Sequence, residues 1–233
     1  MFSSHNNNAD FEKVDTWNEW ETHDRLGFIR KVYGILAFQL CLTAGTCLIP
    51  MYIESTRPFF YSPALLITCI ITTLVLVCAL FCVKKLARTV PTNYILMSIF
   101  TMAEALMVAA ICSRYDPMSV FTAASMTGIL VTGLTVYAMT TKTDFTFLYG
   151  FGVSLVMCLL SMLLFTVFAA FQMRTMYCAF GVLLFSIYLI VDTQLIVSKY
   201  GLDNDDYILG AIILYMDIIQ IFLYILQLFG NKN

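Results

Sequence analysis

The chain has 233 residues, of which 60% are hydrophobic and only 12% are charged. Its mean hydropathy is +0.83, whereas an ordinary soluble domain is about 25% charged. The composition therefore predicts a polytopic membrane protein whose main partner is the lipid bilayer, and it favours a single bundle. A net charge of -2 argues against nucleic-acid binding. Long continuous apolar runs indicate an all-α protein and exclude a membrane β-barrel.

The chain begins with a polar, mostly acidic segment. We expect residues 1–27 to form a disordered cytosolic tail and residues 28–230 to form the bundle. The first hydrophobic run begins after about 30 polar residues, which fits an uncleaved anchor better than a signal peptide.

Seven apolar runs follow, each long enough to cross a hydrocarbon core of about 30 Å at about 1.5 Å per residue. Short connections make consecutive helices antiparallel neighbours, and prolines mark several of the joints. The sequence predicts a seven-helix bundle with the last helix at its centre. The expected spans are Val32–Ile53, Pro63–Val83, Asn93–Cys112, Met118–Met139, Phe147–Ala170, Met176–Val197 and Tyr207–Phe229.

Lysine and arginine are distributed unequally between the two sides of this topology. Nine precede the first span or follow spans two, four and six, and four lie on the other side. The positive-inside rule then places the N-terminus in the cytosol. Seven full crossings would place Asn233 on the opposite side, whereas a last segment that only re-enters would leave both ends in the cytosol.

Two aspartates lie deep inside the last two spans. Asp217 is at the middle of the seventh, and Asp192 is about 9 Å inside the end of the sixth. A buried carboxylate is costly and normally has a partner or faces a wet cavity. The two helices are adjacent and antiparallel, so we expect the carboxyls of Asp192 and Asp217 to face each other and share a proton. The alternative is that each acid is hydrogen-bonded separately and only fixes packing.

Other charged residues lie within the spans or at their ends. Glu104 lies midway in the third span, and Lys84 and Lys85 end the second span at roughly the depth of Asp192. One of the two lysines could pair with the aspartates, or both could be ordinary flanking residues. The acidic patch Asp203, Asp205 and Asp206 at the same end is either a solvated loop or a surface that attracts cations.

The sequence shows little sign of a cofactor or a tightly bound metal. Eight cysteines lie almost entirely within apolar runs, and the only histidines, His5 and His23, are in the tail. Packing is therefore the favoured role of these cysteines.

A set of motifs resembles the transmembrane Bax-inhibitor-motif, or lifeguard, family, and most closely its Golgi anti-apoptotic protein branch. The resemblance extends from about Phe28 to Gly230. Its markers are Phe28-Ile29-Arg30-Lys31-Val32-Tyr33, Ser62-Pro63-Ala64-Leu65, Phe100-Thr101 with Glu104-Ala105-Leu106, Gly133-Leu134-Thr135-Val136-Tyr137, Asp144-Phe145, Asp192-Thr193, and Asp206-Tyr207 leading to Leu214-Tyr215-Met216-Asp217-Ile218-Ile219.

The resemblance implies a calcium-permeable leak in the Golgi or endoplasmic reticulum that suppresses cell death, with calcium as the permeant ion and no cofactor. It implies that Asp192 and Asp217 are a pH-sensing pair. Lys84, Lys85 and Arg88 are the candidates for the family's basic latch, and Glu104 and Asp206 are candidates for the ion path. We expect a basic residue held by the aspartate pair to be released as pH falls.

Other classes of function fit less well. An intramembrane aspartyl protease also needs two buried aspartates, but here Pro63-Ala64-Leu65 precedes both acids instead of following them. The chain also lacks the signature residues of a seven-helix receptor. We therefore expect neither a protease nor any other enzyme, and no receptor. The serious alternative is a non-conducting scaffold that binds cell-death regulators or other calcium channels.

Overall fold

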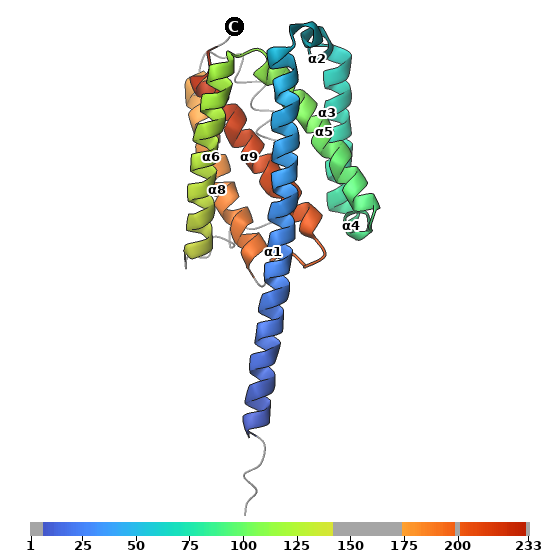
Figure 1. The fold of residues 1–233 in the computed structure, drawn as a ribbon, viewed down its shortest axis with the longest axis vertical. Helices are drawn as coiled ribbons and strands as arrows, with labels where there is room; N and C mark the ends of the chain where they lie inside the picture. The colour runs from blue at the N-terminus through green and yellow to red at the C-terminus, as the bar shows by residue number, and fades with distance from the viewer. Residues whose placement is uncertain (1–6, 142–173, 199–200, 232–233) are drawn as a thin grey trace, which may run out of the picture.

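The computed structural model describes residues 7–141, 174–198 and 201–231, and within these ranges the regular structure is helical. The order of helices along the chain is shown in Figure 1. The long helices are α1 (Asn7–Tyr52), α3 (Pro63–Cys82), α5 (Thr92–Cys112), α6 (Pro117–Thr140), α8 (Arg174–Val197) and α9 (Tyr207–Phe229). The short ones are the 3-10 helix η1 (Glu54–Thr56), α2 (Arg57–Phe60) and α4 (Lys84–Arg88).

The first helix, α1, extends past the rest of the bundle (Figure 1). It already begins at Asn7, so this part of the structure differs from the disordered tail expected over residues 1–27. Residues 7–26 contain neither glycine nor proline. A helix that is already nucleated in the membrane can therefore continue through them at little cost.

Local sequence explains where several helices begin. Proline occupies the first helical position of α3 and α6, where its missing N–H removes no hydrogen bond. The carboxylate of Asp116 caps α6 by accepting a hydrogen bond of 3.0 Å from the Met118 N–H. The backbone N–H of Asp116 donates to the Asn231 carbonyl at 3.0 Å, which ties the end of α9 to the start of α6.

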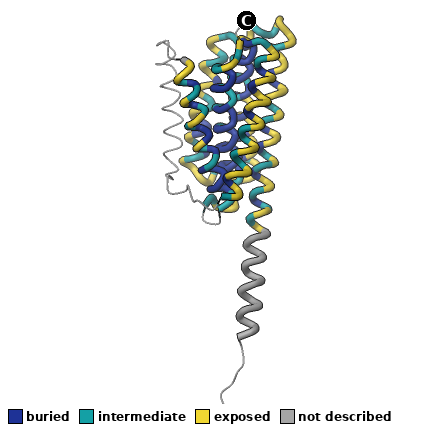
Figure 2. The backbone as a smooth tube through the Cα atoms, turned by 90° about the vertical axis from the view of Figure 1, so that its left-hand side faces the viewer, coloured by how far each residue is buried: buried dark blue, intermediate teal, exposed yellow. Residues whose placement is uncertain are grey.

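Burial concentrates on α9. It packs against α1, α5, α6 and α8, and the dark blue interior in Figure 2 shows how deeply the core is enclosed. Its hydrophobic stretch is 78% buried, compared with 17% for α3 and α6. A lipid-facing helix would not carry this degree of burial, so α9 is enclosed by other helices among the described residues.

Six described helices are long and apolar enough to cross a membrane. They correspond to six of the seven expected spans, and the predicted span Phe147–Ala170 lies outside the described residues. The first candidate span begins earlier than predicted, at Asp24 instead of Val32. The last is one unbroken helix over Tyr207–Phe229, which fits a full crossing better than a re-entrant segment.

The bundle has two ends, which we name by the course of α1. The proximal end holds α4 and the connection between α8 and α9, and the distal end holds α2 and the C-terminus (Figure 1). The core between them is one cluster of buried aliphatic and aromatic side chains from all six long helices.

Candidate functional site

A pair of aspartates is buried between α8 and α9. Asp192 of α8 is 1% exposed and Asp217 of α9 is 4% exposed. The two carboxyl groups lie close enough for Asp192 to act directly on Asp217. The structure therefore brings together the two acids that the sequence places at similar depth, and we call them the aspartate pair.

Close packing of α8 on α9 allows this contact. Gly181 of α8 lies directly against the ring of Tyr224, where a β-carbon would be only 2.7 Å from the ring carbons. The Tyr224 hydroxyl is 2.9 Å from that of Tyr177, so the same ring is also fixed by a hydrogen bond. Glycine at position 181 thus allows the two helices to approach more closely than a larger residue would.

The surroundings of the aspartate pair are largely protein. Thr193 is fully buried, Gln194 is 8% exposed, and Tyr33 of α1 lies against Thr193. In such a low-dielectric setting two carboxylates in contact repel strongly, and a single shared proton converts the repulsion into a hydrogen bond.

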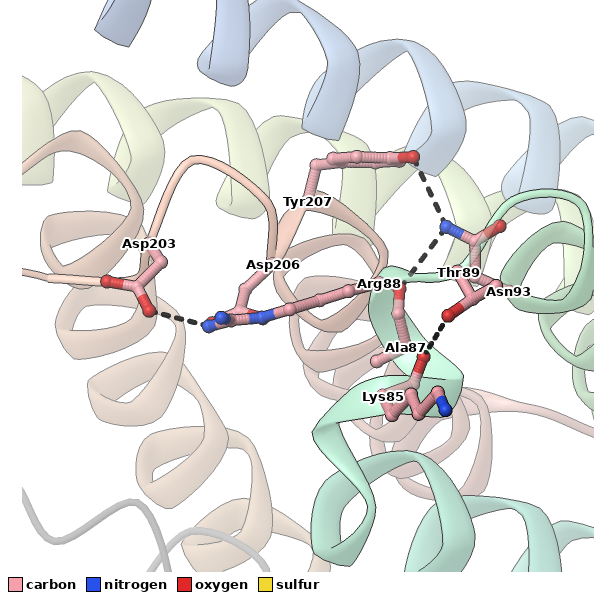
Figure 3. A network of polar contacts seen from close by, with 8 residues as sticks. All are labelled: Lys85, Ala87, Arg88, Thr89, Asn93, Asp203, Asp206 and Tyr207. Carbon is pink, nitrogen blue, oxygen red and sulfur yellow. Dashed lines mark hydrogen bonds and ion pairs between the residues drawn. The ribbon is translucent and has the colours of Figure 1, made fainter.

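A second polar cluster lies at the proximal end, where Arg88 of α4 binds two aspartates of the α8–α9 connection. Its Nε donates to Asp206 Oδ1 at 2.7 Å and its Nη2 to Asp206 Oδ2 at 2.8 Å, and Nη2 also donates to Asp203 (Figure 3). We call these three residues the arginine clamp. The hydrogen bonds that Arg88 donates to Asp206, and then the one that it donates to Asp203, raise the pKa of Arg88 above its usual value. Arg88 therefore stays cationic.

Asp206 occupies the N-cap position of α9, yet its side chain makes no capping hydrogen bond. An aspartate at this position normally accepts a backbone N–H of the first turn. Here both carboxylate oxygens accept from Arg88 instead. The carboxylate remains beside the positive end of the helix dipole, which is a favourable position for a negative charge. The first turn of α9 is thereby attached to α4.

Among the three candidates for the latch, Arg88 contacts aspartates other than the buried pair. The sequence predicts a basic residue held by the aspartate pair, but the described contacts of Arg88 are with Asp203 and Asp206. Lys84 and Lys85 are exposed, and Lys85 points away from the two clamp aspartates (Figure 3). The short helix α4 directs Arg88 toward the start of α9, a geometry that depends on how the chain turns after α3.

Arg25 holds the same connection from the other side, a role that the sequence did not reveal. Its guanidinium donates to the Leu202 carbonyl at 2.6 Å and to the Leu195 carbonyl at 3.1 Å. Leu195 lies in the last turn of α8, so Arg25 caps that helix. Arg25 also lies over the Phe28 ring at 4.5 Å. Two arginines from α1 and α4 thus hold the connection that joins the helices of the aspartate pair.

Neighbouring polar contacts reinforce this end. The Asn93 amide donates to the Ala87 carbonyl and to the Tyr207 hydroxyl, both at 3.2 Å (Figure 3). Lys31 of α1 lies 5.4 Å from the centre of the Tyr207 ring. The first residue of α9 is therefore held by α1 and α5 as well as by the arginine clamp.

Glu104 is separate from both clusters. It lies between α3 and α5, where its carboxyl contacts Thr73 and acts electrostatically on Cys69. Neither aspartate of the pair is among the groups that act on it. Asp206, the other candidate for the ion path, is 4% exposed and ion-paired to Arg88. Asp206 therefore belongs to the arginine clamp among the described residues.

A cluster of polar side chains in the middle of the spans was also not predicted from the sequence. Gln39 donates to the Thr101 hydroxyl at 2.9 Å, and the hydroxyls of Thr43 and Tyr215 are 2.8 Å apart. These bonds join α1 to α5 and α9. Threonine and glutamine within an apolar run are the only sequence signal for such a cluster.

These features define a class: a helical membrane protein with a buried aspartate pair and an ion-paired proximal end. Comparison with known proteins gives the family. Residues 25–233 match the family model described as inhibitor of apoptosis-promoting Bax1. The chain belongs to this Bax-inhibitor family, which confirms the resemblance found in the sequence.

Three relatives illustrate the match. Protein lifeguard 4 of Mus musculus is 37% identical over 217 residues, covering 91% of this chain and 87% of the relative. Protein lifeguard 3 of Homo sapiens is 33% identical over 231 residues, covering 92% and 72%. The Golgi anti-apoptotic protein of Vaccinia virus (strain Lister) is 34% identical over 213 residues, covering 91% and 88%.

Proposed function

We propose that this protein is a calcium leak channel of an internal membrane whose conductance is set by the protonation of Asp192 and Asp217. The observation that carries the proposal is the direct contact of these two buried carboxyl groups at membrane depth. Intramembrane carboxyl groups usually mark ion or proton pathways. Oxygen ligands are also what calcium prefers. The proposed bundle has seven spans with α9 at the centre.

The closed state is held at the proximal end in this proposal. Arg88 binds Asp203 and Asp206 from α4, and Arg25 binds the Leu195 and Leu202 carbonyls from α1. Opening requires the α8–α9 connection to move, and either helix can transmit such a movement because each is rigid. Asp192 lies one turn from Leu195, and Asp217 lies on the helix that begins after Asp206.

Falling pH opens the channel in this scheme. An ionised pair would hold a calcium ion tightly in a low dielectric, and conduction needs a site that releases its ion. Each added proton removes one negative charge from the pair, so binding weakens and calcium can leave. Flux should therefore rise as pH is lowered from about 8 to about 5.

Reconstitution in liposomes tests the proposal. Purified protein should pass calcium with a pH-dependent rate, and Asp192→Asn and Asp217→Asn should each flatten that dependence. The matched control is Asp116→Asn, because Asp116 caps α6 at the distal end. If both pair variants keep the pH profile of the unmodified protein, the aspartates are structural. Absence of flux altogether would favour a non-conducting scaffold that binds cell-death regulators or other calcium channels.

We further propose that the protein suppresses cell death from the Golgi or the endoplasmic reticulum. The support is its similarity to a relative named Golgi anti-apoptotic protein. Expression of the chain in cells treated with an apoptosis inducer tests this, with caspase activation as the readout. An Asp192→Asn/Asp217→Asn double variant separates protection that depends on the aspartate pair from protection by binding alone.

A further inference from the structure

A groove runs along the distal half of the bundle between α1 and α6. It has a volume of about 550 Å³. Its α1 wall extends from Leu40 to Tyr52 and its α6 wall from Pro117 to Thr132. Helix α1 packs on α5 and α9, whereas α6 packs on α8 and α9, so the described parts of α1 and α6 leave a space between them. We call this space the distal groove.

The length of the distal groove along α1 and α6 is comparable to the thickness of one leaflet of a bilayer. Leu40 and Tyr52 are twelve steps apart along α1, and Pro117 and Thr132 are fifteen steps apart along α6, which correspond to about 18 Å and about 22 Å at about 1.5 Å per step. The groove begins at the distal ends of both helices and ends near the middle of each span. Half of a hydrocarbon core is about 15 Å thick. The groove therefore runs from the membrane interface to the bilayer centre.

The residues that line the distal groove favour an apolar ligand. The side chains around the space are mostly aliphatic or aromatic, with Ile218 and Phe222 of α9 as the floor. Three threonines also line it, but their hydroxyls bond within the protein. Thr43 is bonded to Tyr215, and Thr127 and Thr132 donate to carbonyls of α6. A groove of this kind excludes water and favours hydrocarbon.

We propose that the distal groove binds one acyl chain of a glycerophospholipid from the leaflet at the distal side. The surrounding solvent at this depth is lipid, and the groove has the length and polarity of a single chain. The head group would lie near Arg57, which holds the Pro50 carbonyl at the end of α1 at 3.0 Å and is 31% exposed. The bound chain would contact α9 immediately after Asp217, at Ile218.

Substitution of Gly128 tests whether the distal groove binds the acyl chain. It lines the groove, and a β-carbon there would meet nothing within 4 Å. Gly128→Leu should therefore fill the groove without a clash. Gly133 lies on the same helix with equal space around it and is not among the lining residues. Gly133→Leu is the matched control, and Ala124→Leu is a second groove-filling variant should Gly128→Leu fail to fold.

The experiment uses the full chain in liposomes that contain phosphatidylcholine with a photoreactive diazirine in one acyl chain. After illumination, adducts are mapped by peptide mass spectrometry. Adducts on the groove walls should exceed, several-fold per residue, those on the exposed α3 face at Ile67 and Ile71. Gly128→Leu should reduce the groove adducts at least fivefold and leave the α3 adducts unchanged, whereas Gly133→Leu should change neither.

Three results would overturn the proposal. Equal labelling of the groove and the α3 face would mean ordinary contact with bulk lipid. Groove labelling that is the same in Gly128→Leu and Gly133→Leu would mean that the label enters elsewhere. Cross-links that join two copies of the chain through groove residues, without lipid adducts, would identify a protein as the occupant. The outcome does not depend on calcium flux, so it is independent of the proposed channel activity.

Discussion

Replacing Arg88 with glutamine should destabilise the protein by about 3 kcal/mol. The substitution removes both hydrogen bonds to Asp206, whose side chain is 5% exposed, and leaves that carboxylate buried beside the start of α9. Breaking a buried ion pair costs about 3–5 kcal/mol, and the lower end applies because Arg88 itself is 32% exposed. The contact with Asp203 adds less than about 1 kcal/mol, since Asp203 is 67% exposed.

The melting temperature in detergent measures this effect. For a chain of this length, about 1 kcal/mol corresponds to about 2–4 °C, so Arg88→Gln should lower the melting temperature by about 6–12 °C. A thiol-reactive fluorescent dye reports unfolding, because Cys47, Cys69, Cys112 and Cys178 are buried in the folded protein. Asp203→Asn is the matched control and should lower the melting temperature by no more than about 3 °C.

The pair of variants Arg88→Gln and Asp206→Asn isolates the interaction itself. In the double variant no buried carboxylate is left unpaired, so its loss of stability should be smaller than the sum of the two single losses by at least about 1.5 kcal/mol. Strictly additive losses would refute the reasoning. So would an Arg88→Gln melting temperature within about 2 °C of the unmodified protein, because the clamp would then contribute little.

Two further predictions concern the helix contact and the topology. Gly181→Ala should cost about 1–3 kcal/mol, because its β-carbon meets the Tyr224 ring at 2.7 Å, whereas Gly128→Ala meets open space and should be neutral or stabilising by up to about 1 kcal/mol. Equal melting temperatures for the two variants would contradict this account of α8 and α9. An N-terminal tag should be digested by protease added to sealed microsomes, as the positive-inside rule requires, and protection of the tag would reverse the topology.

Much of the fold is predictable because its signals are local. A run of about twenty apolar residues commits the chain to a membrane helix without reference to any other segment. Proline at Pro63 and Pro117 marks where α3 and α6 begin. The contact of Asp192 with Asp217 follows from the same logic, since two adjacent antiparallel helices bring residues of similar depth together.

The arginine clamp cannot be predicted from such local signals. Arg88 and Asp206 are 118 residues apart in the chain, and only the direction of α4 decides whether Arg88 reaches the aspartate pair or the start of α9. Arg25 is harder still, because it binds the Leu195 and Leu202 carbonyls. Backbone acceptors are present in every residue, so such a contact leaves no pattern in the sequence.

The two arginines act on the helices that carry the aspartate pair. Arg25 caps α8 one turn after Asp192, and Arg88 is attached at the residue before α9 begins. Any change in the separation of α8 and α9 at the aspartate pair must therefore be accommodated by their connection, which both arginines hold. Arg88 remains cationic, so movement of the helices is needed to separate it from Asp203 and Asp206. The clamp thus acts as a fixed restraint against which a change in protonation of the pair would have to work.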